Sequence, residues 1–185
     1  SRGLGDVYKR QFYDFIDVTK GLLDKGYGDK ERIYAGGGSA GGLLMGAIVN
    51  MEPNLYKGII SNVPFVDVIT TMSDPSIPLT TGEYSEWGNP DIKEEFEYIM
   101  QYSPYDNISE QEYPSILVTA GLWDSQVQYY EPAKYVAKLR DYNKGKNPIL
   151  MKVNMTAGHS GVSGRFESLK ELAMEYAFLL RLDSN

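Results

Sequence analysis

Three residue types that cooperate in acyl transfer occur in this chain, in the order serine, acid, histidine. Ser39 is the centre of the sequence GGSAG, which matches the pattern G-x-S-x-G, and Asp124 and His159 follow later. A serine hydroxyl is a poor nucleophile near neutral pH unless a base takes its proton, and that base needs an acid to orient it. The residues therefore predict nucleophilic catalysis at Ser39.

The pattern around Ser39 predicts a sharp turn between a strand and a helix. A short strand is expected over 32–35, and the small apolar residues of 41–50 are typical of a buried helix. We expect glycines at Gly37 and Gly41 because the turn leaves no room for side chains. The backbone N–H of Ala40 would then stabilise a developing oxyanion. A glycine-rich turn with a chance serine is the alternative.

His159 is the only histidine, so any imidazole base must be this residue. It follows a predicted strand over 149–154, and Asp124 follows another over 115–120. The carboxyl ends of parallel strands meet at one edge of a sheet, so we expect both side chains near Ser39. Asp106 and the acids near Glu83 compete for the role of the acid, but none directly follows a predicted core strand. A structural or merely exposed histidine is the alternative.

The predicted elements alternate between helix and strand along nearly the whole chain. Helices are expected over 12–23, 41–50, 93–101, 131–142 and 166–182, and strands over 32–35, 57–63, 115–120 and 149–154. This order predicts an α/β fold, a parallel sheet with helices on both faces. The stretch 64–114 is rich in Pro, Thr, Ser, Tyr and acidic residues, and outside its one helix we expect surface loops.

Composition argues against several classes of function. The net charge of -7 disfavours nucleic-acid binding, which needs a basic face. One histidine and no cysteine leave no multi-histidine or cysteine metal site, no disulfide and no thiolate nucleophile, so neither a metal nor another cofactor is expected. No apolar run reaches the roughly 20 residues that span a bilayer, so no membrane partner is expected. The lack of cysteine fits a cytoplasmic protein, with the periplasm also open.

The first eleven residues, SRGLGDVYKRQ, show no useful periodicity. Because DVYKRQ resembles the translated end of an adaptor used in sequencing libraries, we interpret 1–11 as a non-native segment. Native sequence would then begin near Phe12, and 12–185 would be a partial, N-terminally truncated catalytic domain. A poorly ordered native terminus is the alternative.

Several longer stretches carry a family likeness. They are GGSAGG around Ser39, NVPFVDVITTM from Asn62, PLTTGEYSEWGNP from Pro78, SPYDNI from Ser103, VTAGLWDSQVQYYEPAKYVAKLR from Val118 and GHSGVSGRF from Gly158. On these stretches the chain resembles the prolyl oligopeptidase family of serine peptidases, and within it the oligopeptidase B (protease II) branch. The resemblance implies an α/β-hydrolase fold and hydrolysis of peptide bonds in short peptides through an acyl-enzyme. By position it implies Ser39 as nucleophile, Asp124 as triad acid and His159 as base.

The resemblance also implies cleavage after arginine or lysine, with Glu83 recognising the cationic side chain. A carboxylate suits a planar guanidinium through bidentate pairing. Relatives usually carry a second glutamate two positions later, where this chain has Ser85. We therefore expect weaker or relaxed recognition of basic residues. A solvated surface acid is the alternative for Glu83, and Glu86 and Trp87 are expected only to shape the loop.

Two further parts are implied for the full-length protein. The family places an N-terminal β-propeller before this domain, and a tyrosine upstream of Phe12 supplies a second oxyanion donor. Without them and the first strands of the sheet, we expect the chain alone to fold poorly and to be nearly inactive. An acyl-peptide hydrolase or esterase on the same fold is one alternative function. A non-catalytic α/β binding module is another.

Overall fold

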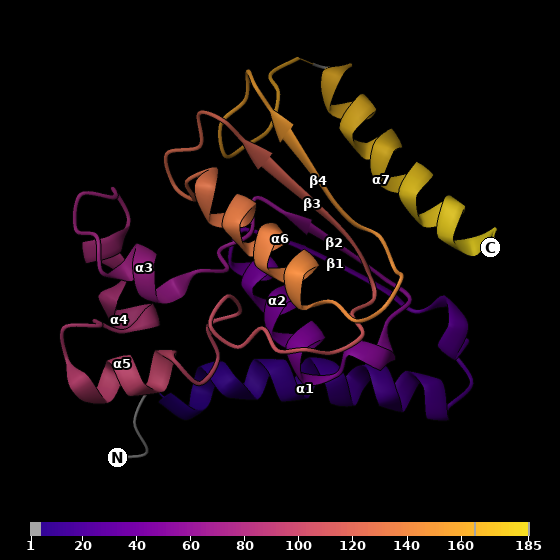
Figure 1. Cartoon of the computed structure of the whole chain (residues 1–185), viewed down its shortest axis with the longest axis horizontal. Helices are drawn as coiled ribbons and strands as arrows, with labels where there is room; N and C mark the ends of the chain where they lie inside the picture. Colours follow the sequence, from indigo (N-terminus) through magenta and orange to yellow (C-terminus); the bar gives the residue numbers. More distant parts are fainter. Residues whose placement is uncertain (1–4, 165, 185) are drawn as a thin grey trace.

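Four parallel strands form a single sheet in the order β1-β2-β3-β4. This computed structural model describes residues 5–164 and 166–184, and only the backbone of 5–8. The strands are β1 (Tyr34–Gly38), β2 (Gly58–Asn62), β3 (Ser115–Gly121) and β4 (Ile149–Asn154). All four carboxyl ends lie at the same edge of the sheet (Figure 1). The predicted parallel α/β architecture is confirmed.

Helices cover both faces of the sheet (Figure 1). On one face lie α2 (Ala40–Met51) and α6 (Tyr130–Tyr142), and on the other lies α7 (Glu167–Asp183). The helix α1 (Gly5–Asp24) packs against the outer side of α2. No helix within residues 5–164 and 166–184 is both long enough and apolar enough to cross a bilayer.

The first helix differs from expectation at its start. It begins at Gly5 rather than near Phe12, and so includes residues 5–11 of the segment that we interpret as non-native. Residues 1–4 of that segment lie outside the described residues. Phe12 and Ile16 on this helix are buried, as the apolar spacing predicts.

The core has two parts because successive side chains of a strand point to opposite faces. Ile59 belongs to the large cluster between the sheet and α2 and α6, whereas Ile60 belongs to the small cluster under α7. The large cluster includes Leu43 and Leu139, both fully buried. The small cluster includes Phe178, the one buried residue of α7. The face opposite α7 therefore holds most of the core.

Outside its one predicted helix, the stretch 64–114 is not a set of surface loops, and that expectation is wrong. Val66, Val68 and Tyr113 within it are fully buried. Its helices are α3 (Val68–Met72), α4 (Tyr84–Trp87) and α5 (Lys93–Ile99), with a 3₁₀ turn, η3 (Thr80–Glu83). Two other 3₁₀ turns are η1 (Lys30–Arg32) and η2 (Pro53–Leu55). Widely spaced apolar residues among polar ones give no clear periodicity, although they complete the large cluster.

Candidate active site

Ser39 occupies the sharp turn between β1 and α2, as the pattern predicts. Its φ of 55° and ψ of -120° place a non-glycine residue in the left-handed region, a strained conformation that surrounding bonds must hold. Its N–H donates to the carbonyl of Asn62 at 2.9 Å, and its own carbonyl accepts from the N–H of Phe65 at 3.1 Å. The last residue of β2 and the segment that follows it therefore fix the turn on both sides of Ser39.

The two glycines of the pattern have different roles. A Cβ atom on Gly37 would lie 2.4 Å from the carbonyl oxygen of Gly41, so only glycine fits at residue 37. A Cβ atom on Gly41 itself would meet no described atom within 4 Å. The expectation that both positions exclude side chains is thus correct for Gly37 and wrong for Gly41.

His159 joins Ser39 to Asp124. Its Nε2 atom lies 3.0 Å from the Oγ atom of Ser39, and its Nδ1 atom lies 2.8 Å from Oδ2 of Asp124. The side chain of Asp124 is 1% exposed and that of His159 is 16% exposed, so water reaches the base but hardly reaches the acid. The three predicted side chains therefore meet as one hydrogen-bonded series.

Other backbone and side-chain bonds fix the loops that carry these residues. The second oxygen of Asp124, Oδ1, accepts from the N–H groups of Gln126 and Val127 at 2.8 and 2.9 Å. The N–H of Trp123 donates to the carbonyl of Ala157 at 3.0 Å, which connects the loop after β3 to the loop after β4. The acid and the base are thereby held relative to each other through their backbones.

The competing acid has a different partner. Asp106 accepts a hydrogen bond from the hydroxyl of Ser103 at 2.6 Å. Asp124 is the carboxylate that contacts the imidazole of His159. The loop after a core strand therefore places Asp124, and not Asp106, beside the imidazole of His159.

Ala40 is the first residue of α2. The first four N–H groups of an α-helix have no acceptor within the helix, and they carry the positive end of its dipole. The N–H of Ala40 is adjacent in sequence to the reactive hydroxyl. It can therefore donate to an oxyanion formed beside Ser39.

A pocket of about 150 Å³ opens beside Ser39 and Ala40. Glu83 lines it and accepts a hydrogen bond from Nε1 of Trp87 at 2.9 Å. Glu86 also lines this pocket, but the neighbouring Ser85 does not. The sequence analysis expects Glu86 only to shape the loop, although its spacing of three residues from Glu83 on a helical turn would place both on one side. The pocket is thus lined by the serine Ser39 and by two acidic residues, Glu83 and Glu86.

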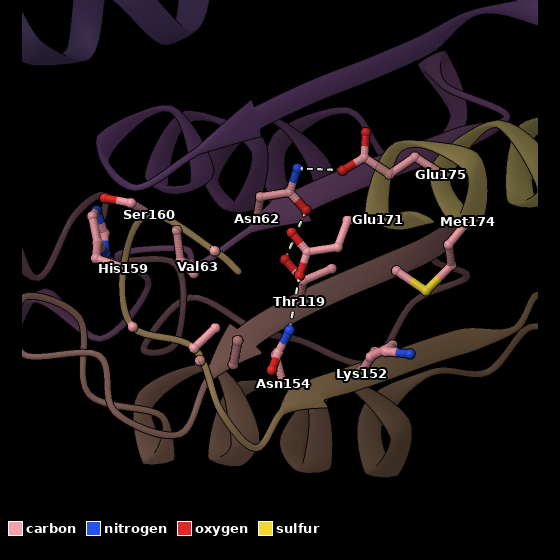
Figure 2. Close-up of a pocket in the computed structure, with 15 residues that line it drawn as sticks. Asn62, Val63, Thr119, Lys152, Asn154, His159, Ser160, Glu171, Met174 and Glu175 are labelled. Carbon is pink, nitrogen blue, oxygen red and sulfur yellow. Dashed lines mark hydrogen bonds between the residues drawn. The ribbon is translucent and has the colours of Figure 1, made fainter. Parts of the chain in front are cut away.

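A second pocket, of about 220 Å³, lies between the carboxyl ends of β2, β3 and β4 and the helix α7 (Figure 2). Asn62 donates to Glu175 at 2.7 Å and accepts from Thr119 at 2.8 Å, while Asn154 donates to Glu171 at 3.0 Å. His159 lies at one end of this pocket (Figure 2). These bonds connect α7 to the edge of the sheet that carries the base. Within the described part of the chain, no cluster of three or more His, Asp or Glu side chains could hold a metal ion.

A family model described as the prolyl oligopeptidase family matches residues 2–184. The chain belongs to this family. Its α/β fold, its serine turn and the order of its site residues agree with the resemblance found in the sequence.

Individual members of the prolyl oligopeptidase family are closely similar to this chain. Dipeptidyl aminopeptidase BI from Pseudoxanthomonas mexicana is 59% identical over 178 residues, which cover 95% of this chain and 25% of that protein. Protease 2 from Moraxella lacunata is 52% identical over 172 residues, covering 93% and 25% respectively. Oligopeptidase B from Leishmania major has a TM-score of 0.90 and 47% identity, covering 92% of this chain and 24% of that chain. The chain thus spans about a quarter of the length of these relatives.

Proposed function

We propose that this chain carries the catalytic triad of a serine peptidase, with Ser39 as nucleophile, His159 as base and Asp124 as acid. The observation that carries the proposal is the hydrogen-bonded series of 3.0 Å from Ser39 to His159 and 2.8 Å from His159 to Asp124. Family membership and similarity to proteins named Protease 2 and oligopeptidase B support a peptide bond as the bond that is cleaved.

The geometry suits acylation of Ser39. The Oγ atom attacks the carbonyl carbon of the peptide bond while Nε2 of His159 takes the hydroxyl proton. Asp124 stabilises the imidazolium and keeps the ring oriented, since Nδ1 donates to its buried carboxylate. When the tetrahedral intermediate collapses, the C–N bond breaks and His159 gives its proton to the leaving amine. Water, activated by the same imidazole, then hydrolyses the acyl-enzyme.

The oxyanion of each intermediate takes a hydrogen bond from the N–H of Ala40 at the start of α2. The family resemblance suggests a tyrosine hydroxyl, from sequence before Phe12, as the second donor. It also suggests an N-terminal β-propeller in the full-length protein, which would restrict substrates to short peptides. Both belong to the proposal for the whole protein.

We further infer that the substrate residue before the cleaved bond is arginine or lysine. Glu83 shares a pocket with Ser39, and its orientation is fixed by the bond from Trp87. A carboxylate held there would pair with a guanidinium or ammonium group. One of the similar structures, oligopeptidase B from Trypanosoma brucei with 46% identity, holds covalently bound antipain.

A second candidate activity is removal of dipeptides, because a relative that is 59% identical is named a dipeptidyl aminopeptidase.

The test of both activities uses the full gene product that contains this chain, with Ser39→Ala as the blank. An internal Arg–X bond, an Arg in the second position of a peptide, and a short acyl ester are compared by kcat/KM. Peptidase action after arginine is expected to exceed ester hydrolysis, and a faster reaction on the ester would contradict the proposal. Preference for the second position would favour the dipeptidyl activity.

A further inference from the structure

Glu131 is a completely buried carboxylate outside the triad, in the first turn of α6. Its Oε1 atom accepts from the N–H groups of Val66 and Asp67 at 2.6 and 2.8 Å, and its Oε2 atom accepts from the hydroxyl of Thr71 at 2.7 Å. A buried charged group is very costly unless it is hydrogen-bonded, and here every bond comes from the segment 66–71. One side chain of α6 therefore holds a whole segment that follows β2.

This segment adjoins Ser39. Phe65, Thr71 and Met72 line the pocket beside the serine, and the N–H of Phe65 donates to the carbonyl of Ser39 at 3.1 Å. The position of these residues therefore sets one wall of the pocket.

The anchoring continues to the opposite wall. The hydroxyl of Thr80 donates to the carbonyl of Thr71 at 2.9 Å, and both threonines are buried. Thr80 begins η3, the turn that ends at Glu83. Gln126 and Val127, from the loop before α6, line the same pocket. The carboxylate of Glu131 thus holds the wall at Thr71 through one hydrogen bond. It holds the wall at η3 through two hydrogen bonds in series, from Thr80 to Thr71 and from Thr71 to Glu131.

We propose that Glu131 is a positioning residue for substrate binding, whose carboxylate holds the walls of the pocket in place beside Ser39. The inference rests on the proposed peptidase function, but Glu131 itself touches no reacting atom. Its loss is expected to impair recognition of the substrate side chain more than the reactivity of the serine.

The groups around Glu131 indicate which substitution should be tolerated. The buried carboxylate of Asp67 forms an ion pair with the partly exposed Lys134, one turn further along α6. Burial and the charges of Asp74, Glu131 and Asp67 raise the pKa of the neighbouring Tyr130. Burial raises the pKa of Glu131 to about 7, although its hydrogen bonds act to lower it. A protonated carboxyl still accepts from two N–H groups through Oε1 and can donate to Thr71. Glutamine offers the same pattern, so Glu131→Gln should preserve the anchor.

The test compares Glu131→Ala, Glu131→Gln and the control Lys134→Met in the full gene product. The control removes the neighbouring ion pair but none of the three bonds to Glu131. The readouts are kcat and KM for an arginyl peptide, the rate of labelling by a small fluorophosphonate, and amide hydrogen exchange over 64–72. For Glu131→Ala we expect KM to rise about tenfold or more, because the walls of the pocket lose the bonds that hold them in place. Its labelling rate should stay within about threefold of the wild-type rate, because the reactivity of the serine depends little on the position of the pocket walls.

Exchange at Val66 and Asp67 should accelerate in Glu131→Ala, while Glu131→Gln and Lys134→Met stay close to wild type. An unchanged KM in folded Glu131→Ala would overturn the proposal. So would a labelling rate that falls by the same factor by which KM rises. If Glu131→Ala does not fold, Thr71→Val replaces it in the test, because this variant removes only one of the three bonds. An unchanged KM in Thr71→Val would also overturn the proposal. If the wild-type protein is not labelled by the fluorophosphonate, that result would contradict the peptidase function. Amide hydrogen exchange at Val66 and Asp67 reports on the anchor whether or not the protein is a peptidase.

Discussion

The two carboxylate oxygens of Asp124 bond to different parts of the site. Oδ2 contacts the imidazole of His159 at 2.8 Å, whereas Oδ1 accepts from the backbone of Gln126 and Val127. The acid therefore orients the base and fixes its own loop, which also lines the substrate pocket. A change at this residue should affect the tautomer of the histidine before it affects the fold.

Asp124→Asn replaces Oδ2 with an amide group of similar size. An amide NH₂ facing Nδ1 of His159 would favour the tautomer that cannot accept the proton of Ser39. We expect kcat to fall on the order of 10³- to 10⁴-fold while the melting temperature changes little. Steady-state hydrolysis of an arginyl amide and a thermal melt give the two values. A loss of less than tenfold would argue against Asp124 as the acid.

Glu83→Gln removes one negative charge from the pocket beside Ser39. A charge-assisted hydrogen bond is worth roughly 1.5–3 kcal/mol, so KM for an arginyl substrate should rise about ten- to a hundredfold. The KM for an uncharged substrate of similar length should change much less. Glu94→Gln, at an exposed position on α5, serves as the control for net charge. Equal effects of Glu83→Gln on charged and uncharged substrates would exclude the assigned role.

Glu86→Gln tests whether the second carboxylate of the pocket compensates for the serine at position 85. Both Glu83 and Glu86 line the pocket, whereas Ser85 does not. We expect a rise in KM for arginyl substrates that is smaller than that of Glu83→Gln, because a hydrogen bond from Trp87 orients Glu83. The same pair of substrates measures it. No change in Glu86→Gln would show that Glu83 acts alone.

The raised pKa of Glu131 makes stability depend on pH. Its pKa is about 7 in the folded protein against an ordinary value of 4.5, so the folded state binds more protons between these values. The free energy of unfolding should therefore fall as pH rises from about 4.5 through 7, by at most roughly 3 kcal/mol. Glu131→Gln should lack this contribution. Melting of both proteins between pH 4.5 and 8 gives the difference, and parallel curves would contradict the assignment.

Gly37→Ala and Gly41→Ala form a matched pair at the serine turn. The added Cβ atom would lie 2.4 Å from a backbone oxygen at residue 37 but would meet open space at residue 41. We expect Gly37→Ala to lose fluorophosphonate labelling, because a backbone contact cannot relax cheaply. Gly41→Ala should keep most of its labelling, since alanine favours the helix by up to about 1 kcal/mol. Similar behaviour of the two variants would contradict this difference.

The sequence alone was sufficient where pattern and chemistry coincide. Ser39 directly follows β1, and Asp124 and His159 lie in the loops after β3 and β4; parallel strands bring such positions to one edge. Glu83 was placed through family likeness, and the structure puts it in the same pocket as Ser39.

The rest depends on contacts between segments that no local pattern records. Most of the residues that line the pocket come from 65–87, where buried residues are scattered among polar ones, so this part was expected at the surface. Glu131 looked like an ordinary acid at the start of a helix, because its three partners are 60 or more residues away. Gly41 looked essential because the pattern treats both glycines alike.

The central claim is that Ser39 is made reactive by His159. Mass spectrometry of the full gene product after treatment with a fluorophosphonate tests it most directly. We predict a single covalent adduct on the peptide that contains Ser39, absent in Ser39→Ala and formed at least about 10³-fold more slowly in His159→Gln. An adduct at another residue, or labelling of Ser39 at an unchanged rate in His159→Gln, would contradict the account.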